Sequence, residues 1–384
     1  MNLRRAGNGA SSYILSAERV LAGDRRVLSE ESFQHMLSIE RKRTERSRKA
    51  FLLMLLDTGA GHAGHNGAKR LNNIVPTLLV NTRETDITGW YKDGTVLGVM
   101  FTELEIEDKE PILRTMLERV SSALRENLTF EQFNRVSISF HLFPENWNHD
   151  SDERPSNPAL YPDLTKRDES RRSFQVMKRV MDIIGSLAAL ICLSPVLAVI
   201  AAAIKLTSKG PILFKQKRIG QYGEPFTFLK FRSMAVNNDA RQHREYVQKL
   251  IAGKAEKQPS EANPAGVYKL TKDPRVTRVG NFLRRMSLDE LPQFFNVLQG
   301  KMSLVGPRPP VPYEVEAYDV WHRRRLLEAK PGITGLWQVN GRSRVKFDDM
   351  VRLDLRYARS WSPWMDVKIL LRTPGAVVLG EGAH

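Results

Sequence analysis

The sequence predicts an α/β protein with two folded domains and one apolar helical segment between them. The chain has 384 residues, which is enough for two domains of about 150 residues each. Residues 29–145 contain short apolar runs and amphipathic stretches, the pattern of mixed strands and helices. From Ile183 to Ile204 there is no charged residue, which is about the length that a helix needs to cross the hydrocarbon core of a bilayer. The predicted parts are a mobile lead over 1–28, a domain over 29–145, a linker over 146–172, an apolar helical segment over 173–209 and a second domain over 210–384.

In the first domain, the predicted elements follow the order strand, helix, hairpin, helix, strand, after a helix that starts at Ser29. The run Phe51–Asp57 is too short to span a bilayer and too apolar for a surface, so it is predicted to be a buried strand. The other elements are a glycine-rich loop over 59–67, a helix around 68–82, a hairpin of 86–91 and 95–102 around Lys92-Asp93-Gly94, a helix over 110–126 and a strand over 135–143. This order is that of a ferredoxin-like α/β sandwich.

On these elements the first domain resembles a degenerate diguanylate cyclase domain. Asp57 ends the first strand, where those enzymes hold a metal, and Arg83–Asp86 precede the hairpin as in that family. The hairpin departs from the family, because Tyr91–Thr95 stand in place of the two-glycine, two-acid turn that cyclases need. The resemblance therefore implies a structural or regulatory domain without cyclase chemistry.

The charge of the chain predicts an anionic partner. The formal net charge is +16 and the pI is near 9.9, so nucleic acid, anionic lipid and phosphorylated substrates all qualify. The single cysteine, Cys192, leaves no disulfide framework and favours a reducing compartment. The first residues lack the apolar core of a signal peptide, so we expect this end in the cytoplasm. Residues 146–172 are rich in Pro, Asn, Asp, Glu and Arg, which predicts a linker.

The apolar segment has a predicted bend at Ser194-Pro195, because proline removes a backbone donor and clashes with the preceding turn of a helix. Lysine and arginine residues stand on both sides of the segment, and such residues mark the cytoplasmic side of a membrane. No second apolar segment of this length follows, so a re-entrant helix would keep both basic domains on one side. A spanning helix and a buried helix of a soluble domain are the alternatives. Lys178 and Asp182 lie one turn apart and are expected to pair.

Two adjacent carboxylates, Asp289 and Glu290, lie in the motif Ser287-Leu-Asp-Glu-Leu-Pro-Gln of the second domain. Adjacent side chains point in different directions, which suits a division of labour: one attacks or exchanges protons while the other holds a metal or a hydrogen bond. A solvated acidic turn is the alternative. Chemistry on a phosphorylated substrate also needs fixed cations and usually Mg²⁺. The candidate phosphate- and substrate-binding residues are Arg232, Arg275, Arg284, Arg308 and Gln293.

Four further motifs accompany this pair, namely Lys230–Met234, Asp273–Thr277, Lys301–Pro309 and Lys330–Val339. In this order, over residues 173–383, the chain resembles the bacterial sugar transferases, which are monotopic phosphoglycosyl transferases. The resemblance implies that a sugar 1-phosphate is moved from a nucleotide diphosphate sugar, with UDP-glucose or UDP-galactose expected, to undecaprenyl phosphate. This reaction starts exopolysaccharide or capsule synthesis. The implied location is the cytoplasmic face of the bacterial inner membrane, and the implied catalytic domain is a mostly helical α+β fold.

The same resemblance implies roles for individual residues. Asp289 would be the nucleophile that forms a phospho-aspartyl-sugar intermediate, and Glu290 would help to hold Mg²⁺. An aspartate is ionised at neutral pH and needs no base, whereas a protonated Asp289 that acts as a general acid is the alternative. Lys178, Arg179 and Asp182 match the family's motif at the start of its membrane helix, and Ser194-Pro195 matches its re-entrant break.

The expected partners are a nucleotide sugar, undecaprenyl phosphate and membrane lipid, with a second copy of the chain as an open alternative. One rival function is a nucleotide-sensing regulator with an inactive transferase domain, although Asp289 and Glu290 are intact. Another is a nucleic-acid-binding protein, which only the charge suggests, since no nucleic-acid motif is present. The aromatic and basic stretch Trp361–Arg372 predicts either a helix in the membrane interface or a core helix.

Overall fold

The computed structural model describes residues 27–57, 74–104, 109–127, 129–134, 136–145, 156–170, 172–235, 241–256, 258–260, 263–268, 275–341 and 344–378. The predicted lead (except Val27 and Leu28), the glycine-rich loop over 59–67 and the first part of the predicted linker lie outside the described residues. The chain divides into two compact units. The first holds the residues up to Glu145 together with Asn157–Lys166, and the second holds Asn146–Ser156 and Arg167–His384.

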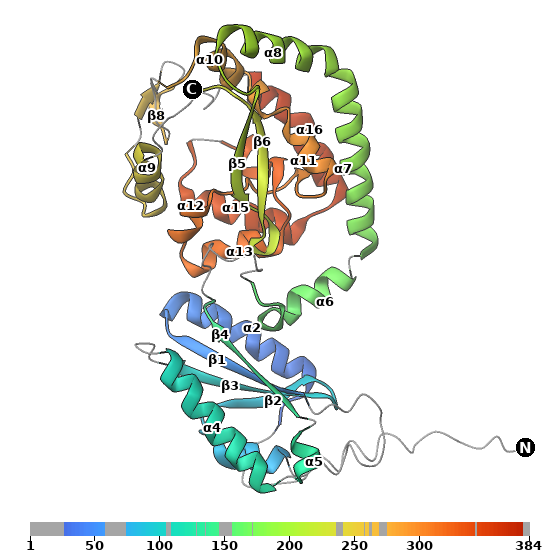
Figure 1. The fold of residues 1–384 in the computed structure, drawn as a ribbon, viewed down its shortest axis with the longest axis vertical. Coiled ribbons are helices and arrows are strands. Elements are labelled where there is room, and N and C mark those ends of the chain that lie inside the picture. The colour runs from blue at the N-terminus through green and yellow to red at the C-terminus, as the bar shows by residue number, and fades with distance from the viewer. Residues whose placement is uncertain are drawn as a thin grey trace, which may run out of the picture. The chain divides into compact units, whose positions relative to one another are not determined.

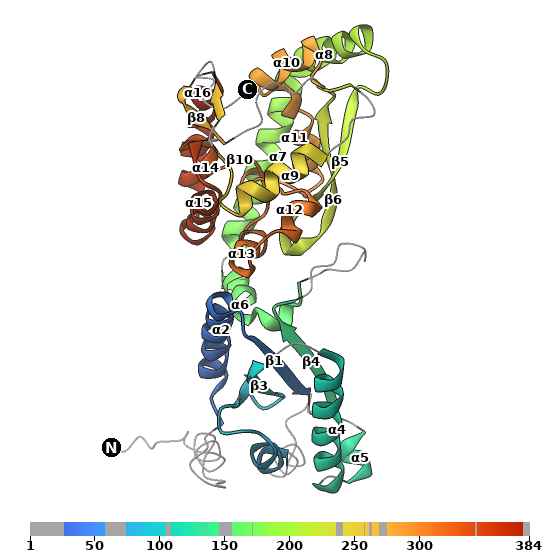
Figure 2. The same ribbon diagram turned by 90° about the vertical axis from the view of Figure 1, so that its left-hand side faces the viewer.

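The first unit is built on an antiparallel sheet in the strand order β2-β3-β1-β4. Its strands are β1 (Ala50–Asp57), β2 (Ile87–Lys92), β3 (Val96–Leu104) and β4 (Ser137–Phe143), and its helices are α2 (Glu30–Ser47), residues 74–81, α4 (Lys109–Asn127) and α5 (Phe130–Phe133). The predicted order of strand, helix, hairpin, helix, strand is therefore confirmed, and Ser29 caps α2 as expected, its Oγ accepting from the Ser32 amide. Figures 1 and 2 show α2 and α4 on opposite faces of this sheet.

Both faces of β1 are covered, which explains why its residues form a continuous apolar run. Leu52, Met54 and Leu56 pack with the helix over 74–81 and with α4 in one core cluster. On the other face, the ring of Phe33 from α2 lies so close to Gly89 and Gly98 that a Cβ at either position would come within 2.6 Å of it. The sequence pattern of a fully buried strand is thus a consequence of two helical layers.

Part of the predicted linker over 146–172 is folded. Residues 158–170 form the 3₁₀ turn η1 (Pro158–Leu160) and helix α6 (Pro162–Ser170). Leu160 and Tyr161 are buried, and the Tyr161 ring meets that of Phe143 edge-on at 6.3 Å while its hydroxyl donates to Glu145 at 2.7 Å. The composition of the segment does not predict this structure, because only a few apolar side chains such as Leu160 and Tyr161 fix it in place.

The apolar segment forms helices α7 (Arg172–Cys192) and α8 (Ser194–Thr207), which meet at an angle of 62°. Figure 1 shows them as a green ribbon that changes direction once. Pro195 lies in the first turn of α8, where its missing N–H leaves no helical bond unmade, and the Ser194 hydroxyl donates to the Ile191 carbonyl at 2.8 Å. The predicted bend is confirmed. Within the described ranges no single helix is long and apolar enough to cross a membrane, whereas this bent pair meets both criteria together.

The second unit is mostly helical, with three two-stranded sheets, one of which pairs β7 (Gln258–Ser260) with β8 (Asn263–Val267). Strands β5 (Leu213–Ile219) and β6 (Pro225–Phe231) form a hairpin around η2 (Gln221–Gly223), and β9 (Ser303–Val305) pairs in parallel with β10 (Gly332–Thr334). The other elements are α9 (Arg241–Ile251), α10 (Arg278–Arg285), η3 (Leu288–Glu290), α11 (Gln293–Leu298), α12 (Pro312–Glu316), α13 (Val320–Glu328), α14 (Leu336–Val339), α15 (Phe347–Ser360) and α16 (Pro363–Val378). One core cluster joins β6, α11, β9, α15 and α16.

Helix α16 is a core helix, which is one of the two predictions for the C-terminal aromatic stretch. Ile369 and Asp366 are buried on one face, and Ile369 belongs to the core cluster. Trp364 and Leu371 are exposed. The helix is therefore a core element that also presents apolar side chains outward.

Three side chains of α7 anchor it to the second unit, and they correct one expectation. Lys178 and Asp182 do not pair with each other: Lys178 Nζ donates to Asp366 Oδ2 at 2.6 Å, and Asp182 Oδ1 accepts from the Ser303 hydroxyl and the Leu304 amide at 2.9 Å. A pair one turn apart on a helix is worth only about 0.2–0.5 kcal/mol, so buried partners on β9 and α16 prevail. Arg179 donates to the carbonyls of Val297 and Leu298, at the end of α11.

The close approach of β9 and β10 requires glycine at position 306, because a Cβ there would lie 2.2 Å from the Lys330 carbonyl oxygen. We expect Gly306→Ala to lower the free energy of unfolding by about 1–3 kcal/mol, as overpacking against backbone does. Denaturant unfolding of the purified protein measures this. Gly375→Ala in α16 is the matched control, since nothing lies within 4 Å of a Cβ there. Equal stability of the two variants would contradict the close approach.

Candidate active site

The adjacent carboxylates lie in a tight turn between two helices. Helix α10 ends at Arg285, Ser287 takes a left-handed backbone conformation (φ 53°, ψ 22°), and the 3₁₀ turn η3 then carries Asp289 and Glu290. This conformation costs a residue other than glycine roughly 1–2 kcal/mol, so the surrounding packing holds it in place. Asp289 is buried, and 19% of the Glu290 side chain is exposed.

Lys230 bridges the two carboxylates. Its Nζ lies 2.9 Å from Glu290 Oε1 and 3.6 Å from Asp289 Oδ2. The side chain of Asn296 on α11 sets this register, because it accepts from the Leu229 amide and donates to the Thr227 carbonyl of β6. The contact between Lys230 and Glu290 joins residues that are 60 positions apart in the chain. It depends on the register that the Asn296 amide fixes.

Arginine side chains surround the pair. Arg308 Nη1 lies 3.3 Å from Glu290 Oε1. Arg218 is buried, donates to the Pro309 carbonyl at 2.7 Å and stands 5.0 Å from the centre of the Phe228 ring, which Lys230 also approaches at 5.5 Å. Burial, and then the charge of Arg308, lowers the pKa of Arg218 to about 10. Such a field of cations favours a bound anion.

The two carboxyl groups respond to this field in opposite directions. Burial alone would raise the pKa of Glu290, but Lys230, Arg308 and Arg218 lower it to about 2. For Asp289 burial prevails, and the charge of Glu290 adds to it, so its pKa is raised above the usual value of 3.8 despite Lys230, Arg284 and Arg308. The environment thus separates the pKa values of the two groups, as in acid–base pairs of enzymes. Glu290 is ionised at neutral pH, and Asp289 is the more basic of the two.

A histidine and a tyrosine lie beside the same arginines. His243 Nδ1 and the Tyr313 hydroxyl are 2.7 Å apart. Burial, followed by the charges of Arg218, Arg308, Arg275 and Arg284, lowers the pKa of His243 to about 4. The imidazole is therefore neutral at physiological pH, and the four arginines act on one region of the second unit.

The structure brings together most of the residues that the sequence singled out. Arg284 and Arg308 act on Asp289, and Arg275 acts with them on His243. Arg232 is bonded to the end of α8, where its guanidinium donates to the backbone and side-chain oxygens of Ser208 at 2.8 Å. Gln293 is buried, and its amide nitrogen has no hydrogen-bond partner among the described residues.

Sequence reasoning missed Lys230 and Arg218 as site residues. Lys230 opens the motif Lys230–Met234, in which Arg232 is the predicted phosphate-binding residue. Arg218 is one of the positive residues that follow the apolar segment. What sets Arg218 apart is visible in the structure alone: it is buried beside Ile219 at the end of a strand whose other residues are exposed or half-buried.

The carboxylates fit a divalent cation of the magnesium kind. Both recorded hydrogen bonds of Glu290 fall on Oε1, and among the described residues Oε2 receives none. No group of three His, Cys, Asp or Glu side chains comes together in the part of the chain that the structure describes. Mg²⁺ commonly binds through one or two carboxylates plus substrate phosphates rather than a full protein cage, and the pair matches that donor set.

Comparisons with known proteins match the part of the chain that carries this site. A family model described as "Bacterial sugar transferase" matches residues 173–380. The "Galactosyl transferase CpsE" of Streptococcus agalactiae is 42% identical over 55% of this chain and 44% of its own length. The "Undecaprenyl-phosphate galactose phosphotransferase" of Salmonella typhimurium is 43% identical over 56% of this chain and 43% of its own. The "Exopolysaccharide production protein ExoY" of Sinorhizobium fredii is 40% identical over 54% and 88%.

The chain thus spans less than half the length of the first two relatives. Among solved structures, a "DGC protein from Thermotoga maritima" matches 31% of this chain and 84% of its own at 20% identity and a TM-score of 0.26. A score this low carries no argument about the first unit. The match of the family model covers more than half of the chain, including Asp289, Glu290, Lys230 and Arg308, and the chain therefore belongs to the bacterial sugar transferase family.

Proposed function

We propose that the chain transfers a hexose 1-phosphate from a UDP-hexose to undecaprenyl phosphate and so starts exopolysaccharide or capsule synthesis. The observation that carries the proposal is the pair Asp289–Glu290, buried beside Lys230 and within the field of Arg218, Arg284 and Arg308. Related proteins named "UDP-glucose:undecaprenyl-phosphate glucose-1-phosphate transferase" are 45% and 42% identical in Klebsiella pneumoniae and Escherichia coli. Four cations around two carboxylates suit a substrate with several phosphate charges.

The reaction would proceed in two displacements at one phosphorus atom. A carboxylate oxygen of Asp289 attacks the sugar-bearing phosphate, forms a new P–O bond and breaks the pyrophosphate bond, and nucleoside monophosphate leaves. A phosphate oxygen of undecaprenyl phosphate then attacks the same phosphorus, and the bond to Asp289 breaks with return of the carboxylate. An aspartate that attacks an anionic phosphate needs fixed cations, and Lys230 and the arginines would hold the phosphate oxygens.

Magnesium is part of the proposal. When bound, Mg²⁺ would neutralise charge on the diphosphate, and the free oxygen of Glu290 would hold it. The low pKa of Glu290 supports this role, because a metal ligand must be ionised. Asp289 is left for the bond to phosphorus.

We also place the second unit at the cytoplasmic face of the inner membrane, with α7 and α8 as a re-entrant pair. The support is an exposed apolar surface that includes Phe174, Val180, Ile184, Leu187 and Ile191 on α7 and Val199 and Leu206 on α8. Helices α10 and α16 add the exposed side chains Phe282, Met286, Trp364 and Leu371. Apolar side chains exposed on this scale mark a membrane-binding or protein-binding surface.

If the pair is re-entrant, both ends of the chain lie on one side of the membrane. Reporters fused at Met1 and at His384 should therefore both read as cytoplasmic. Pro195→Leu restores a backbone donor at the bend and should shift a measurable fraction of molecules to opposite readings. Pro211→Leu, outside both helices, is the matched control and should change nothing. Opposite readings in the unaltered protein would mean a spanning helix.

A direct assay tests the proposed reaction. Purified protein is offered a panel of nucleotide sugars with undecaprenyl phosphate and Mg²⁺, and release of nucleoside monophosphate is followed. Release with one or more UDP-hexoses, together with a lipid-linked phosphosugar, is the expected result. Binding of a nucleotide sugar without any release would favour the nucleotide-sensing regulator.

A further inference from the structure

A cavity of about 320 Å³ in the second unit shares no lining residue with the cluster around Asp289. It lies beside the N-terminal half of α7, and its other walls come from the turn η2, the segment Glu328–Lys330 and the end of α15. Aromatic side chains of Tyr222, Tyr357 and Trp361 form part of the lining. The volume is in the range of small-ligand sites.

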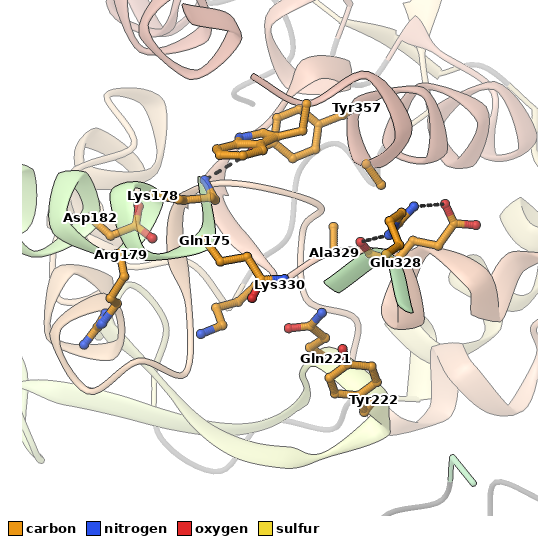
Figure 3. A pocket seen from close by; sticks show the side chains of 13 residues that line it. Gln175, Lys178, Arg179, Asp182, Gln221, Tyr222, Glu328, Ala329, Lys330 and Tyr357 are labelled. Atoms are coloured by element: carbon orange, nitrogen blue, oxygen red, sulfur yellow. Dashed lines mark hydrogen bonds and ion pairs between the residues drawn. The ribbon is translucent and has the colours of Figure 1, made fainter. Parts of the chain in front are cut away.

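Most charged groups near this cavity are already bonded. Lys178 pairs with Asp366, and Arg179 points away from the cavity to the carbonyls of Val297 and Leu298 (Figure 3). Glu328 is the shared partner of three arginines, Arg167, Arg324 and Arg359. Positive charge therefore exceeds negative charge around the cavity, because the carboxylate of Glu328 serves three guanidinium groups and the bonds of Arg179 to described residues go to carbonyls. The other lining carboxylate, Asp182, bonds to Ser303 and Leu304.

Three polar side chains in the cavity are free to bind. Among the described residues, Lys330 has no hydrogen bond or ion pair, and the side-chain amides of Gln175 and Gln221 have none either. Figure 3 shows these three side chains around the same space. Burial, and then the charge of Arg179, lowers the pKa of Lys330, so its ammonium stands in a site that an anion would make more favourable.

We propose that this cavity binds a phosphate-bearing anion, with the ammonium of Lys330 and the amides of Gln175 and Gln221 as its direct contacts. A phosphate group has several acceptor oxygens, which suits one charged and two neutral donors. The surplus positive charge favours an anion over a cation, and the bonded state of the other charged groups leaves Lys330 as the ion-pairing partner.

The position of the cavity indicates a lipid head group as one source of this phosphate. Gln175 precedes the apolar stretch that begins at Ile183 by eight residues of α7, which is about 12 Å along a helix. Basic pockets beside membrane helices on the cytoplasmic side bind anionic head groups. A soluble phosphate compound has the same chemistry, and the experiment separates the two sources.

An occupant would also contact the segment that positions Arg308. The carbonyl oxygen of Lys330 lies against Gly306, and the Gly332 amide donates to the Pro307 carbonyl at 2.8 Å. Both contacts are with residues directly before Arg308 in the chain. A bound anion would therefore fix the backbone from which Arg308 reaches Glu290.

Binding by the full chain tests the inference in two arms. In the first, protein in nanodiscs of phosphatidylglycerol or phosphatidylcholine is released into a mass spectrometer, and retained lipid is counted. In the second, protein in neutral detergent is titrated with inorganic phosphate and glycerol 1-phosphate, and thermal unfolding is followed. Lys330→Met keeps the length of the side chain and removes its charge. Lys346→Met, at an exposed lysine of the same unit, is the matched control.

We expect Lys330→Met to weaken binding about tenfold or more, as loss of a charge-assisted hydrogen bond does, and Lys346→Met to leave it unchanged. Loss of phosphatidylglycerol alone identifies a lipid head group, and loss of the soluble probes alone identifies a soluble phosphate. Equal binding by wild type and Lys330→Met in both arms, or no binding by wild type, would overturn the inference. Asp289→Asn should bind both probes normally, so a failed transferase reaction would leave this result intact.

Discussion

Asp289→Asn should abolish the release of nucleoside monophosphate from UDP-hexose, with a fall in rate of at least about 10⁴-fold, as loss of a covalent nucleophile produces. The substitution keeps the shape of the side chain and removes the oxygen that carries the negative charge. Asp289 is buried next to Lys230, so an amide there also leaves an ammonium with one carboxylate in place of two. Single-turnover release, followed by chromatography of the nucleotide, measures the effect.

Two further substitutions separate this effect from a loss of folding. Asp349→Asn removes an exposed carboxylate of the same unit, which pairs with Arg352, and should leave the rate unchanged. Glu290→Gln should slow release and weaken its dependence on Mg²⁺ without abolishing the attachment of phosphosugar to Asp289. An Asp289→Asn protein that retains more than a trace of activity would show that another group attacks.

Lys230→Met should lower the rate by about 10²–10³-fold, because one cation that faces developing phosphate charge is worth that much in a preorganised site. Its Nζ contacts both carboxylates, and its removal leaves two adjacent negative charges in a buried turn. The pKa of both groups should then rise. Lys217→Met, an exposed lysine of the same hairpin, is the matched control and should retain full activity.

The dependence of the rate on pH shows whether Asp289 acts as a nucleophile or as a general acid. The pKa of Asp289 is already raised by burial, so a nucleophilic Asp289 should gain activity as pH rises through that value. In Lys230→Met the rising limb should move to higher pH. A general acid would behave in the opposite way, with activity lost as pH rises through the same pKa. A falling limb that shifts to another pH in Lys230→Met would therefore support the general-acid alternative.

Local features of the fold could be predicted from the sequence. The Ser29 cap, the buried strand β1 and the break at Ser194-Pro195 follow from short patterns that physical chemistry constrains strongly. The folded part of the linker could not be predicted, because it depends on the contacts that Tyr161 makes with Phe143 and Glu145. Such contacts are fixed by tertiary packing and leave no period in the sequence.

The candidate site, too, could be predicted only in part from the sequence. Asp289 and Glu290 stand out because they are adjacent, and Arg308 because of its motif. The partner of each charge could not be predicted, since Lys178 bonds to Asp366 rather than Asp182 and Arg232 bonds to Ser208. Lys230 reaches Glu290 because Asn296 fixes the register of β6 against α11, and nothing near position 230 in the sequence encodes that.

The mass of the protein after incubation with nucleotide sugar alone tests the central claim most directly. With Mg²⁺ and UDP-hexose but no lipid acceptor, the enzyme should release nucleoside monophosphate in an amount equal to the enzyme present. It should also gain the mass of a phosphohexose on the peptide that contains Asp289. Monophosphate release that strictly requires undecaprenyl phosphate, with no added mass on the protein, would contradict the account and indicate direct transfer between the two substrates.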